Sequence, residues 1–428
     1  MKNISFNQKQ ICKLFIYLSF LLFPFQNLAL RISSSSYDLT AIILIISIFL
    51  FFILNDFQKF SFRKKIAIIY TLIFIAYYLL NYILNYKAPL GRFFASLLWL
   101  VGLLNIIILS SEVKINQRSI FNIINLLLIL ICVHIWIEYF FVIGIDDYNT
   151  YRKARSMSFF AEPSYAGLVL YAASIGYFFI FLLRFNINYL LLFLLNFVSG
   201  YITLSLHIVT FIICLLFFTV IFFFAFKKNI NFTINLKFYL YTFILFIFFI
   251  SFFYYFKSGD FFNHFISRLD IFNFENITNV SLLCWLRGMD QAIASIHKSY
   301  YLFGMGLGST GEFPFYSEFG NKLESYGLGT LTLKDSYSLF FRLIIEIGLL
   351  AVIIFLVYLL YRLIHFYNFI CRNSSRNKAY IVFNFLFGIS ILIGSLLKEP
   401  NFSRSSLYIS LFLISSINFD SKKIKIEN

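Results

Sequence analysis

Long apolar runs recur from near the start of this chain almost to its end, and they constrain its fold more than any other feature. A helix that crosses a bilayer needs about 20 consecutive apolar residues. About twelve runs approach that length, and the last is short enough to lie at the membrane interface instead. They cover residues 13–30, 39–54, 66–86, 92–110, 120–143, 164–183, 188–204, 206–226, 236–256, 337–361, 379–397 and 405–419. The sequence therefore predicts an all-α, polytopic integral membrane protein with about 12 transmembrane helices.

Composition excludes a soluble fold. Hydrophobic residues make up 61% of the chain and charged residues only 13%, whereas soluble domains carry about 25% charged residues. A soluble domain of this size leaves roughly a quarter of its unfolded surface in contact with water, and a mean hydropathy of +0.84 does not allow that. Soluble enzymes, soluble nucleic-acid binders and disordered scaffolds are excluded.

The positive charge follows membrane topology. The chain has 35 Lys and Arg against 19 Asp and Glu, a formal net charge of +16. Basic residues gather in every second connection between the predicted spans, for example at residues 63–65 and 227–228, and again after the last span at residues 422–425. Because cytoplasmic connections are enriched in Lys and Arg, we predict that both termini are cytoplasmic. The charge then requires no nucleic-acid partner.

The cysteines and histidines predict no metal site and no cofactor. Five of each are scattered along the chain. Only Cys284 falls in a predicted external connection, so no disulfide is expected there. The histidines form no pair at helical spacing, and no Cys or His cluster has the spacing of a metal site.

Two external connections are much longer than the others, and they indicate where the chemistry lies. One covers residues 144–163 and the other residues 257–336, within a single membrane domain of residues 1–428. Long connections in compact proteins are usually functional. A transporter would more often carry its chemistry at the bilayer midplane, between repeated halves, and the sequence shows no convincing internal repeat. We therefore expect an external active site.

The first external connection ends in a candidate anion site. Pro163 suits the first turn of a helix, and the free N–H groups of an outward-facing helix N-terminus favour an anion. Arg152, Lys153 and Arg155 precede that helix, and arginine can bind phosphate oxygens through two hydrogen bonds. The alternative is that Arg155 simply pairs with Glu162 beside the helix start.

The second external connection contains two arginines, Arg268 and Arg287, a glycine-rich run at 303–311, and a closing polar group that begins near Asp335. Glycines permit a close backbone approach to a ligand. The spacing matches neither a dinucleotide-binding turn nor a P-loop, and no strand precedes it. A surface loop without a ligand is the alternative interpretation.

Three further charged residues lie near the predicted outer membrane surface. Arg342 and Glu346 are four residues apart and share one face of a helix. They either neutralise each other or contribute directly to the site. Lys398, at the next outer connection, either adds positive charge to the same site or anchors the helix at the lipid headgroups.

Taken together, these segments resemble a known family. The string Arg155…Ser158-Phe159-Phe160-x-Glu162-Pro163-Ser164-x-x-Gly167 is similar to a segment of the Wzy-type O-antigen and exopolysaccharide polymerases. So is the later arrangement of Arg287, Phe303-Gly304-x-Gly306-x-Gly308 and Asp335-Ser336-Tyr337, followed by Glu346-x-Gly348. The O-antigen ligases of the same superfamily usually carry a His where Asp335-Ser336 stands, which argues against a ligase.

The resemblance implies a metal-independent glycosyltransferase of the C-type architecture, working at the outer face of the bacterial inner membrane. It would join undecaprenyl-pyrophosphate-linked oligosaccharide units, donor to acceptor, into O-antigen or a related surface polysaccharide. Developing negative charge on the leaving pyrophosphate needs positively charged donors, and the acceptor hydroxyl needs a base. The implied catalytic residues are Arg155, Arg287, Glu162 and Asp335, with Glu162 and Asp335 as alternative bases. The implied substrate-binding residues are Arg152, Lys153, Ser164, Arg268, Arg342 and Lys398. Trp285, Tyr300, Tyr301 and Tyr316 are candidates for stacking on sugar rings.

Two other functions stay open. An O-antigen ligase would transfer the finished glycan to the lipid A core, and a flippase or exporter would move the lipid-linked oligosaccharide across the membrane. An exporter predicts charged residues along a central cavity and two related halves. The family resemblance also implies membrane lipid, a chain-length regulator and a separate flippase as partners.

Overall fold

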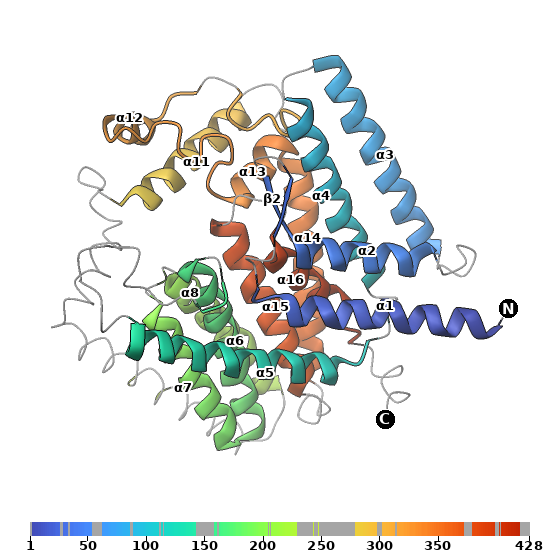
Figure 1. Ribbon diagram of the computed structural model, residues 1–428, viewed down its shortest axis with the longest axis vertical. Helices are drawn as coiled ribbons and strands as arrows, with labels where there is room; N and C mark the ends of the chain where they lie inside the picture. The colour runs from blue at the N-terminus through green and yellow to red at the C-terminus, as the bar shows by residue number, and fades with distance from the viewer. Residues whose placement is uncertain are drawn as a thin grey trace. The chain divides into compact units, whose positions relative to one another are not determined.

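In the part of the chain that the structure describes, the elements are helices apart from one short β-hairpin (Figure 1). The computed structural model describes residues 2–25, 29–32, 35–53, 62–85, 89–110, 113, 115–142, 158–160, 162–203, 205, 207–228, 243, 247, 279–297, 302–312, 315–371, 379–398, 402 and 404–419. The helices are α1 (Lys2–Leu22), α2 (Leu39–Ile53), α3 (Phe62–Asn85), α4 (Leu90–Leu109), α5 (Gln117–Ile137), the π-helical turn η3 (Glu138–Val142), α6 (Pro163–Arg184), α7 (Ile187–Ile202), α8 (His207–Lys228), α11 (Val280–His297), α12 (Glu318–Ser325), α13 (Leu339–Glu346), α14 (Leu349–Ile370), α15 (Ala379–Lys398) and α16 (Ser405–Ser416).

The helices are those of a membrane protein. Within the described residues, six helices are long and apolar enough to cross a bilayer, on α4, α5, α6, α8, α14 and α15. Five shorter apolar helices accompany them. The total of twelve spans stays a prediction, and the predicted span at 236–256 lies outside the described residues except for Phe243 and Ile247.

Contacts divide the chain into two compact units. Unit 1 comprises Met1–Asn116, Thr278–Arg362 and Ile391–Asn418. Unit 2 comprises Gln117–Ile277, Leu363–Ser390 and Phe419–Asn428.

In unit 2, helix α6 is buried along residues 164–183, and only its first and last residues are more accessible. Small residues along α6 let its neighbours approach closely, which is how transmembrane helices commonly pack. A Cβ atom on Gly176 would lie 2.6 Å from the Phe383 ring of α15, and one on Gly167 would lie 2.3 Å from Cβ of Ser205. The predicted division of residues 188–226 into two helices is confirmed, because α7 ends at Ile202 and α8 begins at His207.

In unit 1, the first predicted span at 13–30 is wrong at its C-terminal end. Helix α1 stops at Leu22, and strand β1 (Ala29–Ile32) pairs antiparallel with β2 (Ser35–Asp38). The hairpin ends at Asp38, whose carboxylate accepts the backbone N–H groups of Thr40 (3.0 Å) and Ser405 (3.1 Å). One aspartate therefore satisfies free donors at the start of both α2 and α16.

The predicted span at 337–361 is also corrected, because it consists of two helices, α13 and α14. The break lies at Gly348, which has φ +92°. A Cβ atom there would lie 2.3 Å from the Gly304 nitrogen and 2.4 Å from the Leu302 oxygen, so only glycine fits. Arg342 and Glu346 consequently lie on the short helix α13, ahead of the long apolar helix.

The large external connection predicted at 257–336 is not a plain loop. Its described part contains α11 and the short amphipathic helix α12. Helix α11 contacts both α12 and α13, so the segment folds back onto the short helix α13 (Figure 1).

Candidate functional site

A buried polar network in unit 1 surrounds Arg342 on α13. Its Nε donates to Glu346 Oε1 at 2.9 Å, and its Nη2 donates to Ser96 Oγ at 3.1 Å. Thr310 Oγ1 also donates to Glu346 Oε1, at 2.8 Å. The guanidinium Cζ lies 4.6 Å from the centre of the Phe402 ring. Additional hydrogen bonds help a buried ion pair to offset its lost hydration. Here those to Glu346 all reach its Oε1, and its Oε2 is buried without a hydrogen-bond partner among the described residues.

Asp335 is the member of this network that solvent can reach. Its Oδ1 lies 3.8 Å from Arg342 Nη1. The Asp335 side chain is 40% exposed, compared with 9% for Arg342 and 0% for Glu346. The structure therefore brings together two predicted site residues, Asp335 and Arg342, as an exposed carboxylate in front of a buried arginine.

The turn that carries Asp335 is strained and anchored from several sides. Thr332, Ser336 and Tyr337 have φ values of 56°, 55° and 57°, in the left-handed region that side chains disfavour. Ser336 Oγ donates to Gln291 Oε1 on α11 at 2.6 Å. Strained backbone of this kind persists only where its surroundings hold it, and it concentrates at functional sites.

Two more contacts anchor the same turn. Ser338 Oγ donates to the Leu396 carbonyl at 2.8 Å. A Cβ atom on Gly288 of α11 would lie 2.2 Å from the Ser336 carbonyl oxygen, so α11 approaches the turn at a distance that only glycine allows.

Arg287, a predicted catalytic residue, is 4% exposed on α11. Its Nη1 donates to the Gly329 carbonyl at 2.6 Å, and its Nη2 donates to the Leu331 carbonyl and to Thr332 Oγ1. Burial lowers the pKa of the Arg287 guanidinium from its ordinary value. In this arrangement Arg287 holds the loop that leads to Asp335 and is directed at carbonyl oxygens, not at solvent.

The glycine-rich run packs against the end of α13. Met305 N donates to the Ile345 carbonyl at 2.7 Å, and Gly306 N donates to the Glu346 carbonyl at 3.2 Å. Gly304 has φ +72°, and a Cβ atom on it would lie 2.6 Å from the Glu346 oxygen. Close backbone packing explains Gly304, whereas Gly306 has open space around it and is explained by its φ of +101°.

Arg92, near the start of α4, was missed by sequence reasoning. Its Nη1 pairs with Glu312 Oε1 at 2.9 Å. Its Nη2 donates to the carbonyls of Thr310 (3.1 Å) and Lys334 (2.7 Å). Arg92 thus joins the glycine-rich run to the Asp335 turn. Its partners are more than two hundred residues away in sequence, so no local pattern could have indicated it.

In unit 2, Glu162 and Ser164 lie at the start of α6, as predicted from Pro163. Glu162 is the exposed N-cap residue, but its side chain accepts no backbone N–H of the helix. Instead, Ser164 Oγ donates to Glu162 Oε2 at 3.1 Å. Ser205 Oγ donates to the Ser164 carbonyl at 3.4 Å, which ties the turn between α7 and α8 to the same helix start.

Three other predicted residues lie in the described part of the chain, and six lie outside it. Lys398 is the half-buried last residue of α15. Trp285 packs on Phe341 and donates its indole N–H to the Leu397 carbonyl at 3.1 Å, whereas Tyr316 is 74% exposed. The predicted residues outside the described part of the chain are Arg152, Lys153, Arg155, Arg268, Tyr300 and Tyr301.

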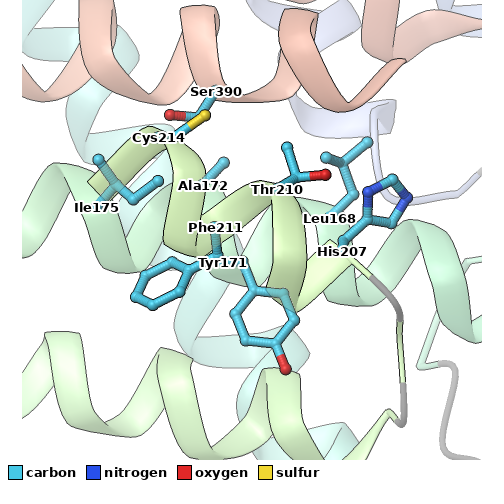
Figure 2. Close-up of a pocket in the computed structure, with 9 residues that line it drawn as sticks. All are labelled: Leu168, Tyr171, Ala172, Ile175, His207, Thr210, Phe211, Cys214 and Ser390. Carbon is cyan, nitrogen blue, oxygen red and sulfur yellow. The ribbon is translucent and has the colours of Figure 1, made fainter. Parts of the chain in front are cut away.

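A small pocket in unit 2 lies between α6, α8 and α15 (Figure 2). It is lined by Leu168, Tyr171, Ala172, Ile175, His207, Thr210, Phe211, Cys214 and Ser390. The space that the centre of a water molecule can occupy in it is about 10 Å³, which is about enough for a single water molecule and far too little for a drug-sized ligand. None of the predicted site residues lines it.

Comparison with known proteins gives no assignment: no protein-family model matches the sequence, and no curated protein matches it. Within the described residues, no group of three or more His, Cys, Asp or Glu side chains is placed to hold a metal ion.

Proposed function

We propose that this chain is a membrane-embedded glycosyltransferase that polymerises oligosaccharide repeat units carried on undecaprenyl pyrophosphate, at the outer face of the bacterial inner membrane. The observation that carries the proposal is the half-exposed Asp335 carboxylate, held on a strained and anchored turn in front of the buried Arg342. The resemblance of the motifs around Glu162 and Asp335 to the Wzy-type polymerases supplies the substrate class.

In the proposed reaction, Asp335 accepts the proton of the acceptor hydroxyl. The acceptor oxygen then bonds to the anomeric carbon of the donor while the bond from that carbon to the pyrophosphate oxygen breaks. The electron pair of that bond leaves with the lipid pyrophosphate. Arg342 holds the Asp335 carboxylate in orientation, since its Nη1 faces Oδ1 and its other nitrogens are bound to Glu346 and Ser96.

Glu162 is the second candidate base, exposed at the start of α6 with Ser164 as its partner. Arg155 stays the first candidate for stabilising the leaving pyrophosphate, because arginine binds phosphate oxygens in pairs and its segment adjoins Glu162 in sequence.

The test is the surface glycan ladder of a strain that lacks this chain, on a gel that resolves single repeats. The strain is complemented with the parent, Asp335→Asn, Glu162→Gln or, as a matched control, Glu318→Gln, an exposed carboxylate on α12. A general base contributes about 10²–10⁴-fold to the rate, so the variant that lacks it should leave a single repeat at normal protein levels. The control should give the parental ladder.

Two outcomes would overturn the proposal. Loss of every repeat in the deletion strain, the first included, would indicate an exporter or a ligase. A full ladder in both Asp335→Asn and Glu162→Gln would exclude both carboxylates as the base.

A further inference from the structure

Helix α5 does not end in an ordinary way. Its last turn, η3, is π-helical and begins at Glu138. Such turns are rare and are frequently found at functional sites. Glu138 is an acidic residue at the end of a long apolar helix, where an ionisable group needs a partner.

The Glu138 carboxylate connects α5 to the segment that precedes α6. Its Oε2 accepts the backbone N–H of Ser158 at 3.0 Å. Its Oε1 lies 3.2 Å from Nδ1 of His134, one turn earlier on α5. The side chain is 19% exposed, so this link is largely shielded from water.

The segment that Glu138 contacts is closely held. Ser158 has φ 54° and is 7% exposed. The Phe159 ring lies 4.5 Å from the His134 ring, and Phe160 is completely buried. A left-handed serine is retained only where neighbouring contacts fix it, and here those contacts come from His134 and Glu138.

We infer that Glu138 is a positioning residue for the start of α6. By binding Ser158 N–H, it fixes the path along which the chain enters that helix, and therefore the place of the exposed Glu162 carboxylate. The His134 ring lies beside the Glu138 carboxylate and packs on Phe159. The effect on catalysis rests on the proposed function with Glu162 as its base, whereas the anchoring of the segment does not.

Thiol labelling tests the anchor without any catalytic turnover. Ser158→Cys reports the segment, because the Ser158 hydroxyl makes no hydrogen bond with the described residues and the backbone N–H is retained. The background is Cys371→Ser, since the other four cysteines are buried. We expect Glu138→Ala to accelerate maleimide labelling at least tenfold. Glu138→Gln, whose amide oxygen can still accept the N–H, should label like the parent.

The matched control is Phe141→Ala, a 67% exposed residue of the same π-helical turn, which should leave labelling unchanged. Equal labelling rates in Glu138→Ala and the parent would overturn the anchor. In a transferase assay with lipid-linked repeat units, Glu138→Ala should lower kcat about tenfold or more with KM nearly unchanged, and Glu138→Gln should restore it.

Faster labelling with an unaltered kcat would overturn the positioning role while leaving the anchor in place. A parent protein with no transferase activity would refute the proposed function, and the labelling rates would still decide whether Glu138 anchors the segment.

Discussion

Arginines that look alike in the sequence have different roles in the structure. Arg287 is buried and donates to loop carbonyls, so it organises the backbone. Arg342 is buried against a carboxylate and faces a second, exposed one. Arg92 joins two loops through Glu312 and main-chain oxygens. Residue type made Arg287 and Arg342 candidates for the site. Only their partners in the folded chain show that Arg287 holds the backbone of a loop, whereas Arg342 faces an exposed carboxylate.

The Arg342–Glu346 pair leads to a prediction about stability. Removing one member of a buried ion pair leaves the other charge unpaired and costs about 3–5 kcal/mol. Glu346→Ala should therefore lower the unfolding free energy by about that amount, since Glu346 also binds Thr310. The double variant Arg342→Met/Glu346→Leu should lose clearly less than the sum of the Arg342→Met and Glu346→Leu single variants.

Denaturant unfolding of the purified protein in detergent measures all of these variants. Additive effects of Arg342→Met and Glu346→Leu would contradict the direct coupling between the two side chains.

At the scale of elements, the break between α13 and α14 depends on one residue. Gly348 combines φ +92° with backbone atoms of Leu302 and Gly304 in the place of a Cβ. Gly348→Ala should therefore destabilise the protein by more than the roughly 1–2 kcal/mol that a left-handed alanine costs by itself. Two controls separate the cost of the left-handed backbone from the cost of the steric contact. Gly327 has φ +71° and open space around it, and Gly91 lies inside α4 with open space around it.

The expected order of thermal stability is Gly91→Ala at or above the parent, then Gly327→Ala, then Gly348→Ala. If Gly348→Ala were no worse than Gly327→Ala, the close approach of the Leu302–Gly304 backbone would not be the cause of the break.

The sequence predicted the elements that depend on local apolar pattern and missed those that depend on distant contacts. The turn between α7 and α8 was predicted, because a single helix over those residues would far exceed the bilayer. The start of α6 was predicted from Pro163. The hairpin after Leu22 and the break at Gly348 were missed: each lies in or beside an apolar run, and Gly348 is explained only by Leu302 and Gly304.

In the candidate site, too, the sequence predicted some residues from local pattern and missed those that depend on distant contacts. Asp335 and Arg342 were identified by residue type and motif, and the structure brings them together. The residues that hold them, Ser96, Thr310 and Gln291, are ordinary polar residues far away in sequence. Thr310 lies in the predicted glycine-rich run but was not itself a candidate, and nothing local distinguishes Ser96 or Gln291 from other serines and glutamines, because their role exists only in the folded chain.

At the scale of the whole molecule, the distribution of Lys and Arg predicts a membrane orientation that single cysteines can test. Asn188, at the start of α7, follows the basic Arg184 connection and is expected on the cytoplasmic side. Glu318, on α12, belongs to the large connection expected outside. Both side chains are exposed, so their labelling depends on the side of the membrane and not on burial.

In intact spheroplasts, a membrane-impermeant maleimide should label Glu318→Cys and leave Asn188→Cys unlabelled, each in the Cys371→Ser background. After permeabilisation both should react. The opposite pattern would invert the topology and move the Asp335 turn to the cytoplasmic side. A reaction that uses lipid-linked repeat units at the outer face would then be excluded, because Asp335 is separated from α12 only by residues 326–334, with no predicted span between them.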